Sequence, residues 1–453
     1  MSDLPVVVIG AGPQGLAAAA HLLERGQTPL VLEAGAGPAF AVSQWAHVRL
    51  FSPWPELIDP AAARLLAPSG WVAPGAGYPT GGEWISSYLK PLAQQLAEQV
   101  RYGARVSGVS RRGRDRLVSA GRAAAPFVVH VTGPAGEESR VEARAVIDAS
   151  GTWARPNPAG ADGLPAIGEK AAADAGVLSY LPPTPQQAQA GAGGHTIVVG
   201  SGHSALTAII ELASTAKAEP GTRVTWVLRR GVIGDTFGGG TSDELPERGA
   251  LGLRAREAIQ AGLVDLVTGF RIEEVQQSET GVVLVSQDGR SLPAADRVVV
   301  LTGFRPDLSF LSEMRLDLDS VLQAPVRLAP EIDPNEHSCG SVMPHGAKEL
   351  AHPEPKLYLV GMKSYGRAPT FLAMTGYEQV RSIAAELAGD HEAAARVELT
   401  LPDTGVCGGS GVFDETAPAD AGGGCCGAPI DLAAPSVPEG ALIVPLLGAV
   451  SGR

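Results

Sequence analysis

The chain has 453 residues, of which 45% are hydrophobic, and this predicts a soluble globular protein of two or three domains. Its formal net charge of −13 argues against nucleic acid or an anionic membrane as a partner, because phosphates require a basic surface. The N-terminal residues carry no basic region or cleavage signal, and no apolar run is long enough to span a bilayer, so we expect a cytoplasmic protein.

The first predicted element is a βαβ unit at the N-terminus. An apolar strand at 6–9 leads into the turn GAGPQG at 10–15, an alanine-rich helix follows to about residue 26, and a strand at 30–32 ends in Glu33. The glycines let the backbone approach a pyrophosphate at the helix N-terminus, and the acidic residue can accept hydrogen bonds from a ribose diol. The pattern predicts a dinucleotide site; the alternative is a glycine-rich turn that binds nothing.

Further strands follow, and then the βαβ pattern repeats. The stretch FVVHVTGPAGEESRVEARAVIDA predicts a strand, a turn and a strand. The second unit has a strand at 196–199, the turn GSGHSA at 200–205, a helix to about residue 216 and a strand at 223–228. This strand ends in Arg229 and Arg230, which suit the 2′-phosphate of NADP better than the diol of NAD. The alternative for these arginines is a solvated strand end.

Two such units, one N-terminal and one nearly 200 residues later, make the chain resemble the flavoproteins with two dinucleotide folds, in which NADPH reduces FAD. Over about residues 1–395 it resembles more closely their class B flavin-dependent monooxygenase branch. AVIDASGTWARPNP and VVVLTGFRPDLSFL resemble the segments that leave and re-enter the FAD domain. The FxGxxxHxxxW fingerprint of class B is absent, which argues against the N-hydroxylating and Baeyer–Villiger groups.

The resemblance extends to the C-terminal stretch KLYLVGMKSYGRAPTFLAMTGYEQVRSIAAELAGD, which implies a strand into Gly361, a loop, and a helix from about Thr375 whose N-terminus faces the flavin. Together the motifs and the resemblance imply the residues around FAD, namely Gly10, Ala11, Gly12, Pro13, Gln14, Gly15, Glu33, Ala34, Gln44, Trp45, Val106, Ala149, Ser150, Gly151, Gly361 and Thr375. Those implied around NADPH are Gly200, Ser201, Gly202, His203, Ser204, Ala205, Arg229, Arg230, Thr302 and Gly303.

The catalytic candidates are few, because the flavin itself performs the chemistry and the protein supplies position and electrostatics. The segment SQWAHVRLFSPW falls where related proteins have a Gly-Gly-x-Trp segment over the flavin, so Gln44, Trp45 and Arg49 are candidates to line the isoalloxazine pocket. Trp54 of the same segment is expected in the core, and Val106 is expected near the adenine end. The catalytic candidates are Trp45, Arg49, Cys339 and Arg367.

Cysteine positions favour oxygen as the electron acceptor. Disulfide reductases of this fold relay electrons through a cysteine pair near the flavin, yet the first 338 residues contain no cysteine. Reduced flavin is therefore expected to pass its electrons to O₂, either forming a C4a-hydroperoxide that oxygenates a small-molecule substrate or releasing hydrogen peroxide. A monooxygenase is the leading prediction, and an NADPH oxidase is an alternative.

The four cysteines, Cys339, Cys407, Cys425 and Cys426, suggest a soft substrate. The stretch around Cys339 and the late GGGCCG segment resemble flavin monooxygenases associated with arsenic resistance. Trivalent arsenic binds two or three thiolates, so these residues could capture a trivalent arsenical for oxidation. Two alternatives remain: a reductase whose C-terminal dithiol accepts electrons, as in mercuric reductase, and a protein that only binds a soft metal. Incidental thiols in a disordered end are a further interpretation.

The predicted fold class is α/β, with two Rossmann-like three-layer domains and parallel sheets. We expect an FAD domain from residues 1–162 and 304–395, an NADPH domain from 163–303 inserted between them, and a flexible Gly/Pro-rich tail at 396–453 that contains cysteines.

Overall fold

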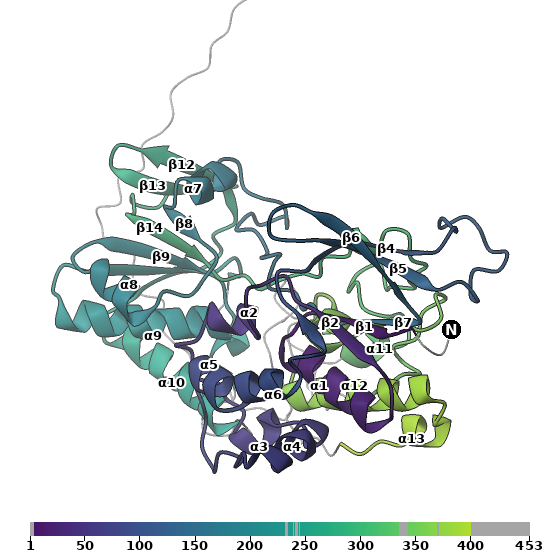
Figure 1. Cartoon of the computed structure of the whole chain (residues 1–453). Coiled ribbons are helices and arrows are strands. Elements are labelled where there is room, and N and C mark those ends of the chain that lie inside the picture. The colour runs from purple at the N-terminus through teal and green to yellow at the C-terminus, as the bar shows by residue number, and fades with distance from the viewer. Residues whose placement is uncertain are drawn as a thin grey trace, which may run out of the picture.

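A computed structural model describes residues 4–231, 234–238, 240, 243, 245–334, 343–368 and 371–399. Two parallel sheets organise it (Figure 1). The first sheet has the strand order β15-β7-β1-β2-β3 and the second has the order β11-β10-β9-β14-β8. We call the elements around the first sheet the first domain and those around the second sheet the second domain.

The first sheet combines strands from both ends of the described chain. Its strands are β1 (Val6–Ile9), β2 (Pro29–Leu32), β3 (Val100–Arg101), β7 (Ala145–Asp148) and β15 (Leu357–Leu359). All four residues of β1 are buried, since the strand lies between β2 and β7 with both faces of the sheet covered. β15 pairs with β7, so a segment beyond residue 350 completes a sheet that begins at residue 6.

Helices cover one face of the first sheet and an antiparallel sheet covers the other. The helical layer contains α1, α4 and α12, whose apolar residues share one core with β1. The opposite layer is β4-β5-β6, which packs on the other side of the same strands. The elements of both layers are α1 (Pro13–Glu24), α2 (Phe40–Ser43), α3 (Trp54–Leu57), α4 (Pro60–Leu66), α5 (Gly81–Trp84), α6 (Lys90–Gln95), α11 (Ala329–Ile332), α12 (Ala373–Ala388), α13 (His391–Ala395), β4 (Arg105–Arg111), β5 (Phe127–Thr132) and β6 (Glu138–Ala143).

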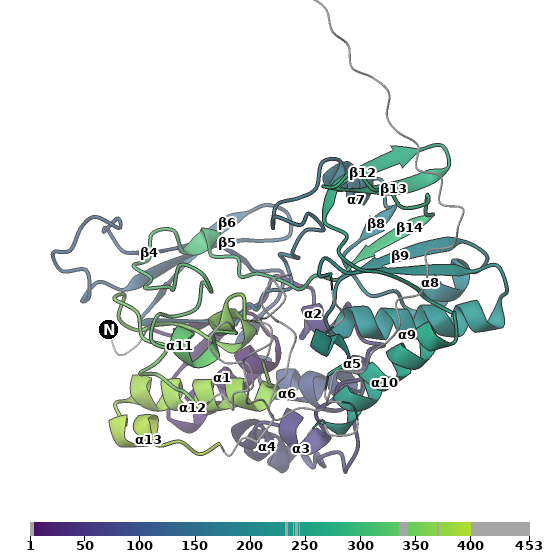
Figure 2. The same cartoon turned by 180° about the vertical axis from the view of Figure 1, so that it is seen from behind.

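The second domain repeats this layering. α9 and α10 pack side by side on one face of its sheet, and the β12-β13 hairpin with α7 covers the other (Figure 2). Its elements are α7 (Glu169–Asp174), β8 (Leu178–Ser179), α8 (Pro185–Ala190), β9 (His195–Val199), α9 (His203–Ala218), β10 (Arg223–Val227), α10 (Pro246–Gln260), β11 (Asp265–Val267), β12 (Ile272–Ser278), β13 (Gly281–Ser286) and β14 (Arg297–Val300). The predicted α/β fold with two parallel-sheet, three-layer Rossmann-like domains is therefore confirmed.

Two segments connect the domains and pair with each other. We call them the linker ribbon: residues 149–158 lead out of β7, and residues 301–308 lead out of β14. The N–H of Asn157 donates to the carbonyl of Gly303 at 2.8 Å, and the N–H of Arg305 donates to the carbonyl of Arg155 at 2.9 Å. The rings of Trp153 and Phe304 stack with centroids 4.5 Å apart. The two connections of the linker ribbon therefore pair with each other in an antiparallel arrangement.

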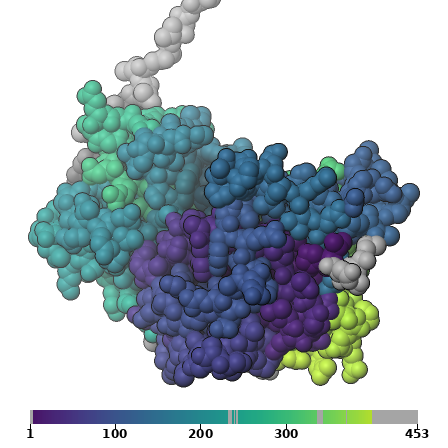
Figure 3. All heavy atoms as spheres, in the orientation of Figure 1, coloured from purple at the N-terminus to yellow at the C-terminus, as the bar shows by residue number. Residues whose placement is uncertain are grey.

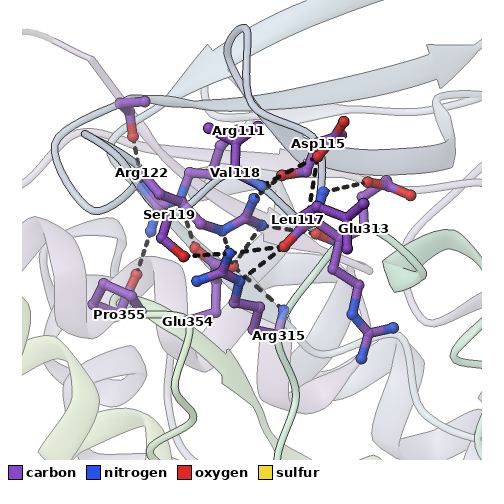
Figure 4. Close-up of polar contacts among 12 residues, drawn as sticks. Arg111, Asp115, Leu117, Val118, Ser119, Arg122, Glu313, Arg315, Glu354 and Pro355 are labelled. Carbon is purple, nitrogen blue, oxygen red and sulfur yellow. Dashed lines mark hydrogen bonds and ion pairs between the residues drawn. The ribbon is translucent and has the colours of Figure 1, made fainter.

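A buried charge cluster anchors the loop between β4 and β5 (Figure 4). Glu354 is 1% exposed and accepts hydrogen bonds from Arg111 at 2.8 Å and from Arg122 at 2.7 Å. Although burial acts to raise the pKa of Glu354, the hydrogen bonds from Arg122 and Arg111 outweigh it and lower this pKa. The remaining guanidinium N–H groups donate to backbone carbonyls, including those of Pro355 and Glu313. The cluster thus joins segments more than 200 residues apart in the sequence.

Candidate functional site

The first glycine turn lies at the carboxyl end of β1, before α1. Gly10 has φ +100°, a backbone conformation that favours glycine. A Cβ on Gly15 would lie 1.9 Å from the carbonyl oxygen of Gly10, so only glycine allows this close packing of helix and strand. A Cβ on Gly12 would meet nothing within 4 Å, which leaves open space at the N-terminus of α1. The first-turn N–H groups of a helix have no intrahelical partners, so this space suits a pyrophosphate.

Glu33 stands at the end of β2, beside this turn. Its carboxylate accepts hydrogen bonds from the N–H of Ala11 and the N–H of Gly35, both at 2.7 Å. A carboxylate has further lone pairs that can accept the hydroxyls of a ribose. Ala34 is exposed next to it. Val106 lies in the first residues of β4, which run past Glu33 through a hydrogen bond from Ala104 to the Glu33 carbonyl.

Ala149, Ser150 and Gly151 leave β7 at the same edge of the sheet. The N–H of Ala149 donates to the carbonyl of Ile9 at 3.0 Å, and a Cβ on Gly10 would lie 2.9 Å from the carbonyl oxygen of Ala149. The departing chain therefore lies directly against the glycine turn. Gly151 has φ +66° where the chain turns towards the second domain.

Gln14, Gly361 and α12 meet at this edge as well. The side chain of Gln14 donates to the carbonyl of Ala373, the first residue of α12, at 3.0 Å. A Cβ on Gly361 would lie 2.9 Å from Gln14 Cγ, and Thr375 is buried in the first turn of α12. The helix begins at Ala373, two residues before the predicted Thr375, and its N-terminus lies beside that of α1. Pro13 is the first residue of α1, where its missing N–H removes no helical hydrogen bond.

The second glycine turn reproduces the first. Gly200 has φ +128°, and a Cβ there would lie 2.3 Å from the carbonyl oxygen of Leu301, whereas a Cβ on Gly202 would meet nothing within 4 Å. Ala205 is fully buried where the first turn has its third glycine. Ser201 is half-buried and Ser204 is exposed at this turn. A second dinucleotide therefore fits at the N-terminus of α9.

His203, the first residue of α9, lies at the contact between the domains. Its ring is 5.0 Å from the ring of Phe51, which comes from the first domain. Burial lowers the pKa of His203 to about 4, with a further lowering by Arg248 that Asp243 opposes. The imidazole is therefore neutral at pH 7. Figure 3 shows the first hundred residues, in purple and blue, lying directly against the teal second domain.

The other residues predicted around NADPH follow the carboxyl ends of strands in the second sheet, as the second turn does. Arg229 and Arg230 follow β10 at its carboxyl end, and Arg229 is exposed and donates to the carbonyl of Ala161 at 3.0 Å. Thr302 and Gly303 lie in the linker ribbon, where the Thr302 hydroxyl donates to the carbonyl of Asn157 at 2.8 Å. The two arginines thus follow β10, which pairs with the strand that leads into the second turn, and Thr302 and Gly303 form part of the ribbon.

The isoalloxazine candidates occupy different environments. The ring of Trp45 is half-buried against the first-domain core and so close to α5 that a Cβ on Gly81 would lie 2.9 Å from it. Gln44 is half-buried beside it. Arg49 is exposed and donates to the carbonyl of Tyr78, whereas Trp54 is buried in the core, as expected.

The last catalytic candidates are Arg367 and Cys339. Arg367 is exposed and donates to the side chain of Gln323 at 3.0 Å. Cys339, Cys407, Cys425 and Cys426 lie outside the described residues. Within the described ranges, no group of three or more His, Cys, Asp or Glu side chains could hold a metal ion, and no helix is long and apolar enough to cross a membrane.

The structure also reveals polar residues that the sequence patterns missed. Asp148 at the end of β7 and Lys363 after β15 form a buried ion pair at 2.6 Å on the cofactor edge of the first sheet. A carboxylate that ends the apolar strand AVID was a usable signal, because charged residues are rarely buried without a partner. Nothing in the sequence identified Lys363 as that partner, since 215 residues separate the two.

The chain matches the family model described as pyridine nucleotide-disulphide oxidoreductase over residues 7–327. It belongs to this family. The match includes both glycine turns and the whole second domain. A comparison with curated protein sequences gives no match.

Solved structures share the fold at low sequence identity. Bacillithiol disulfide reductase from Bacillus cereus has 21% identity and a TM-score of 0.63, with 85% of this chain and 99% of that chain covered. Ornithine hydroxylase from Pseudomonas aeruginosa has 17% identity and a TM-score of 0.56, covering 85% and 99%. The cadaverine monooxygenase DfoA from Erwinia amylovora, solved with FAD, has 14% identity and a TM-score of 0.55, covering 88% and 98%.

Family membership, the fold and the two glycine turns together make the chain an FAD-dependent oxidoreductase that uses a nicotinamide dinucleotide, NAD(P)H. The cofactors predicted from the sequence are confirmed at this level.

Proposed function

We propose that the chain is an NADPH-dependent FAD monooxygenase that oxidises a trivalent arsenical. FAD would bind at the turn before α1 with Glu33 on its adenosine ribose, and NADPH would bind at the turn before α9 with Arg229 and Arg230 on its 2′-phosphate. When bound, the flavin accepts a hydride from NADPH and delivers the electrons to O₂. The residues of the chain bind and orient both cofactors and shield the site from water.

The observation that carries the proposal is the absence of a thiol relay. The described residues contain no cysteine, and neither does the rest of the chain before residue 339. A family member without a cysteine pair in this region lacks the internal acceptor that a thiol relay requires. Oxygen is an acceptor that needs no side-chain relay, which favours a monooxygenase.

The arsenical substrate is supported by the positions and chemistry of the thiols. All four cysteines follow residue 338, and Cys425 and Cys426 are adjacent. Thiolates are the ligands that soft ions prefer, and trivalent arsenic is soft. The reaction would combine the arsenical, O₂, NADPH and a proton to give NADP⁺, water and the pentavalent product, which carries one of the two oxygen atoms.

The test is a balance of products. Purified protein is mixed with NADPH and O₂, with and without arsenite or methylarsenite, and NADPH loss, peroxide and arsenic oxidation state are followed together. We expect one pentavalent arsenic for each NADPH consumed and less peroxide when the arsenical is present. If peroxide matched NADPH and no pentavalent arsenic formed, the protein would be an NADPH oxidase and the arsenical assignment would be wrong.

A disulfide reductase is the second candidate, because the fold is shared with bacillithiol disulfide reductase. In this case Cys425 and Cys426 would accept electrons from the flavin. The double variant Cys425→Ser, Cys426→Ser separates the two functions under anaerobic conditions with a disulfide acceptor. Loss of flavin reoxidation by the disulfide in that variant alone would favour the reductase.

A further inference from the structure

A buried ion pair joins the cofactor edge of the first sheet to the base of the linker ribbon. Lys363 Nζ lies 2.6 Å from Asp148 Oδ2, and the two side chains are 1% and 0% exposed. Asp148 is the last residue of β7 and stands opposite Ile9 of β1 on one side and Leu359 of β15 on the other. Asp148 therefore lies at the carboxyl end of an interior strand, level with the residue that precedes the first glycine of the turn.

Lys363 also contacts the outgoing segment and the short helix that follows the returning segment. Its ammonium donates to the Ser150 hydroxyl at 3.0 Å, and that hydroxyl donates to Asp148 Oδ1 at 2.6 Å. On the return side, the ammonium lies 4.4 Å from the centre of the Phe310 ring, in the 3₁₀ helix η5 (Ser309–Leu311) that follows the ribbon. One ammonium group thus contacts the end of β7, the outgoing segment and the element after the returning segment.

The charge of Lys363 also reaches Asp307 on the returning segment. Burial acts to raise the pKa of Asp307, but hydrogen bonds from Ser309 and the positive charges of Lys363 and Arg155 outweigh it and lower this pKa. Arg155, on the outgoing segment, lies 3.6 Å from Asp307. Two carboxylates therefore interact with the charge of Lys363: Asp148 at the end of β7, and Asp307 on the returning segment.

A gain in folding stability is a weak explanation for the burial of the Asp148–Lys363 ion pair. Taking two charges out of water is expensive, and a buried pair is often no better than well-packed apolar side chains. A buried pair does require one geometry, since each group needs its partner. Here the pair adjoins the point where the outgoing chain meets the glycine turn, since Ala149, the residue after Asp148, donates to the carbonyl of Ile9 and lies against Gly10.

We propose that Lys363 is a positioning residue for hydride transfer: it holds Asp148, Ser150 and the η5 segment together, so that the linker ribbon presents the second domain to the first in one orientation. The inference rests on the proposed assignment of FAD to the first domain and NADPH to the second. The step that it positions moves a hydride, which is two electrons and one proton, from NADPH to FAD and leaves NADP⁺ and reduced flavin. It does not depend on which acceptor receives the electrons afterwards.

The test compares Lys363→Met with the double variant Asp148→Asn, Lys363→Met. Anaerobic flavin reduction by saturating NADPH is followed by the loss of flavin absorbance, alongside FAD content, melting temperature and reduction by dithionite. In Lys363→Met we expect the limiting rate to fall at least about 10-fold, because small misplacements are costly in hydride transfer, while the Kd of NADPH changes little. In the double variant we expect melting temperature and FAD content to return to the parent values while reduction by NADPH stays slow.

A matched control is Lys170→Met, the same substitution in an exposed ion pair with Asp174 on α7. Its reduction rate should equal that of the parent. Parent-like reduction in an FAD-loaded Lys363→Met protein, or full recovery of the rate in the double variant, would show that Lys363 only neutralises Asp148 and would overturn the inference. If NADPH failed to reduce the parent protein itself, the cofactor assignment would be wrong and the inference about Lys363 would fail with it. Failure of the inference alone is distinguished because NADPH then reduces the parent and the Lys363→Met protein equally fast.

Discussion

At the scale of single residues, the two nucleotide sites differ in the side chain that ends the neighbouring strand. β2 and β10 occupy equivalent places, each parallel to the strand that carries its glycine turn. β2 is followed by Glu33, whose carboxylate accepts hydrogen bonds, whereas β10 is followed after Leu228 by Arg229 and Arg230, which can only donate them. Two turns with the same strand, turn and helix order are thus flanked by strand ends of opposite charge.

This difference predicts the coenzyme preference. Arg229→Ala and Arg230→Ala each remove a positive charge that would bind the 2′-phosphate of NADPH, a group that NADH lacks, and Arg229→Ala also removes the hydrogen bond to the carbonyl of Ala161. Since a hydrogen bond to a charged group contributes about 1.5–3 kcal/mol, we expect KM for NADPH to rise about 10- to 100-fold, with little change for NADH. Steady-state kinetics with both coenzymes measures this preference.

Arg223→Ala is the matched control, because Arg223 begins the same strand and pairs with Asp265 on the surface. It should leave both KM values unchanged. An unaltered preference in the Arg229 and Arg230 variants would place recognition of the 2′-phosphate elsewhere.

At the scale of elements, the cofactor edge depends on a three-way contact between α1, α12 and the end of β15. The Gln14 side chain occupies the space between them, and two glycines make that space available. A Cβ on Gly376 would lie 2.4 Å from Gln14 Cδ, and one on Gly361 would lie 2.9 Å from Gln14 Cγ. The packing of the two helices is therefore specified by the Gln14 side chain and by two glycines, which leave room for it.

Gly376→Ala is expected to displace the amide end of Gln14, which lies at the clash, and to break its hydrogen bond to the carbonyl of Ala373. Overpacking typically costs about 1–3 kcal/mol, and we expect the low end of this range because a side chain can move, with weaker FAD binding where the N-terminus of α12 loses this contact. Melting temperature and FAD retention after gel filtration measure both effects. The double variant Gln14→Ala, Gly376→Ala removes the clash and should recover most of the lost stability. Additive losses in the double variant would instead show that Gly376 is required for another reason.

These elements also show what the sequence could predict. The glycine turns, their strands and the acidic or basic strand ends are local patterns, so the fold class and both dinucleotide sites were predictable from short windows. The contacts that join distant segments were not, because Lys363 gives no local sign of Asp148, nor Gly376 of Gln14. The strands β5 and β6 in the third layer of the first domain were predicted from the stretch FVVHVTGPAGEESRVEARAVIDA, whereas the β12-β13 hairpin of the second domain was not predicted.

At the scale of the whole molecule, the second domain is inserted into the first through the linker ribbon. The ribbon brings Asn157 and Gly303 together, with the N–H of one donating to the carbonyl of the other at 2.8 Å. Residues opposite each other in an antiparallel pair have Cα atoms only about 5 Å apart. The first sheet takes all its strands from before residue 149 and after residue 356, so its core needs no residue of the inserted part.

A shortened chain in which two glycines replace residues 158–302 is therefore expected to fold. It should bind FAD and be reduced by dithionite, yet show no reduction by NADPH, because the turn at Gly200 and both arginines are removed. Phe51, which packs on His203, would become exposed, so Phe51→Ser is included in the shortened chain and in a full-length control. Circular dichroism, flavin absorbance and anaerobic reduction test the three expectations. A shortened chain that stays unfolded while the full-length control folds would mean that the domains form one cooperative unit, and hydride transfer would then depend on shared folding as well as on the ribbon.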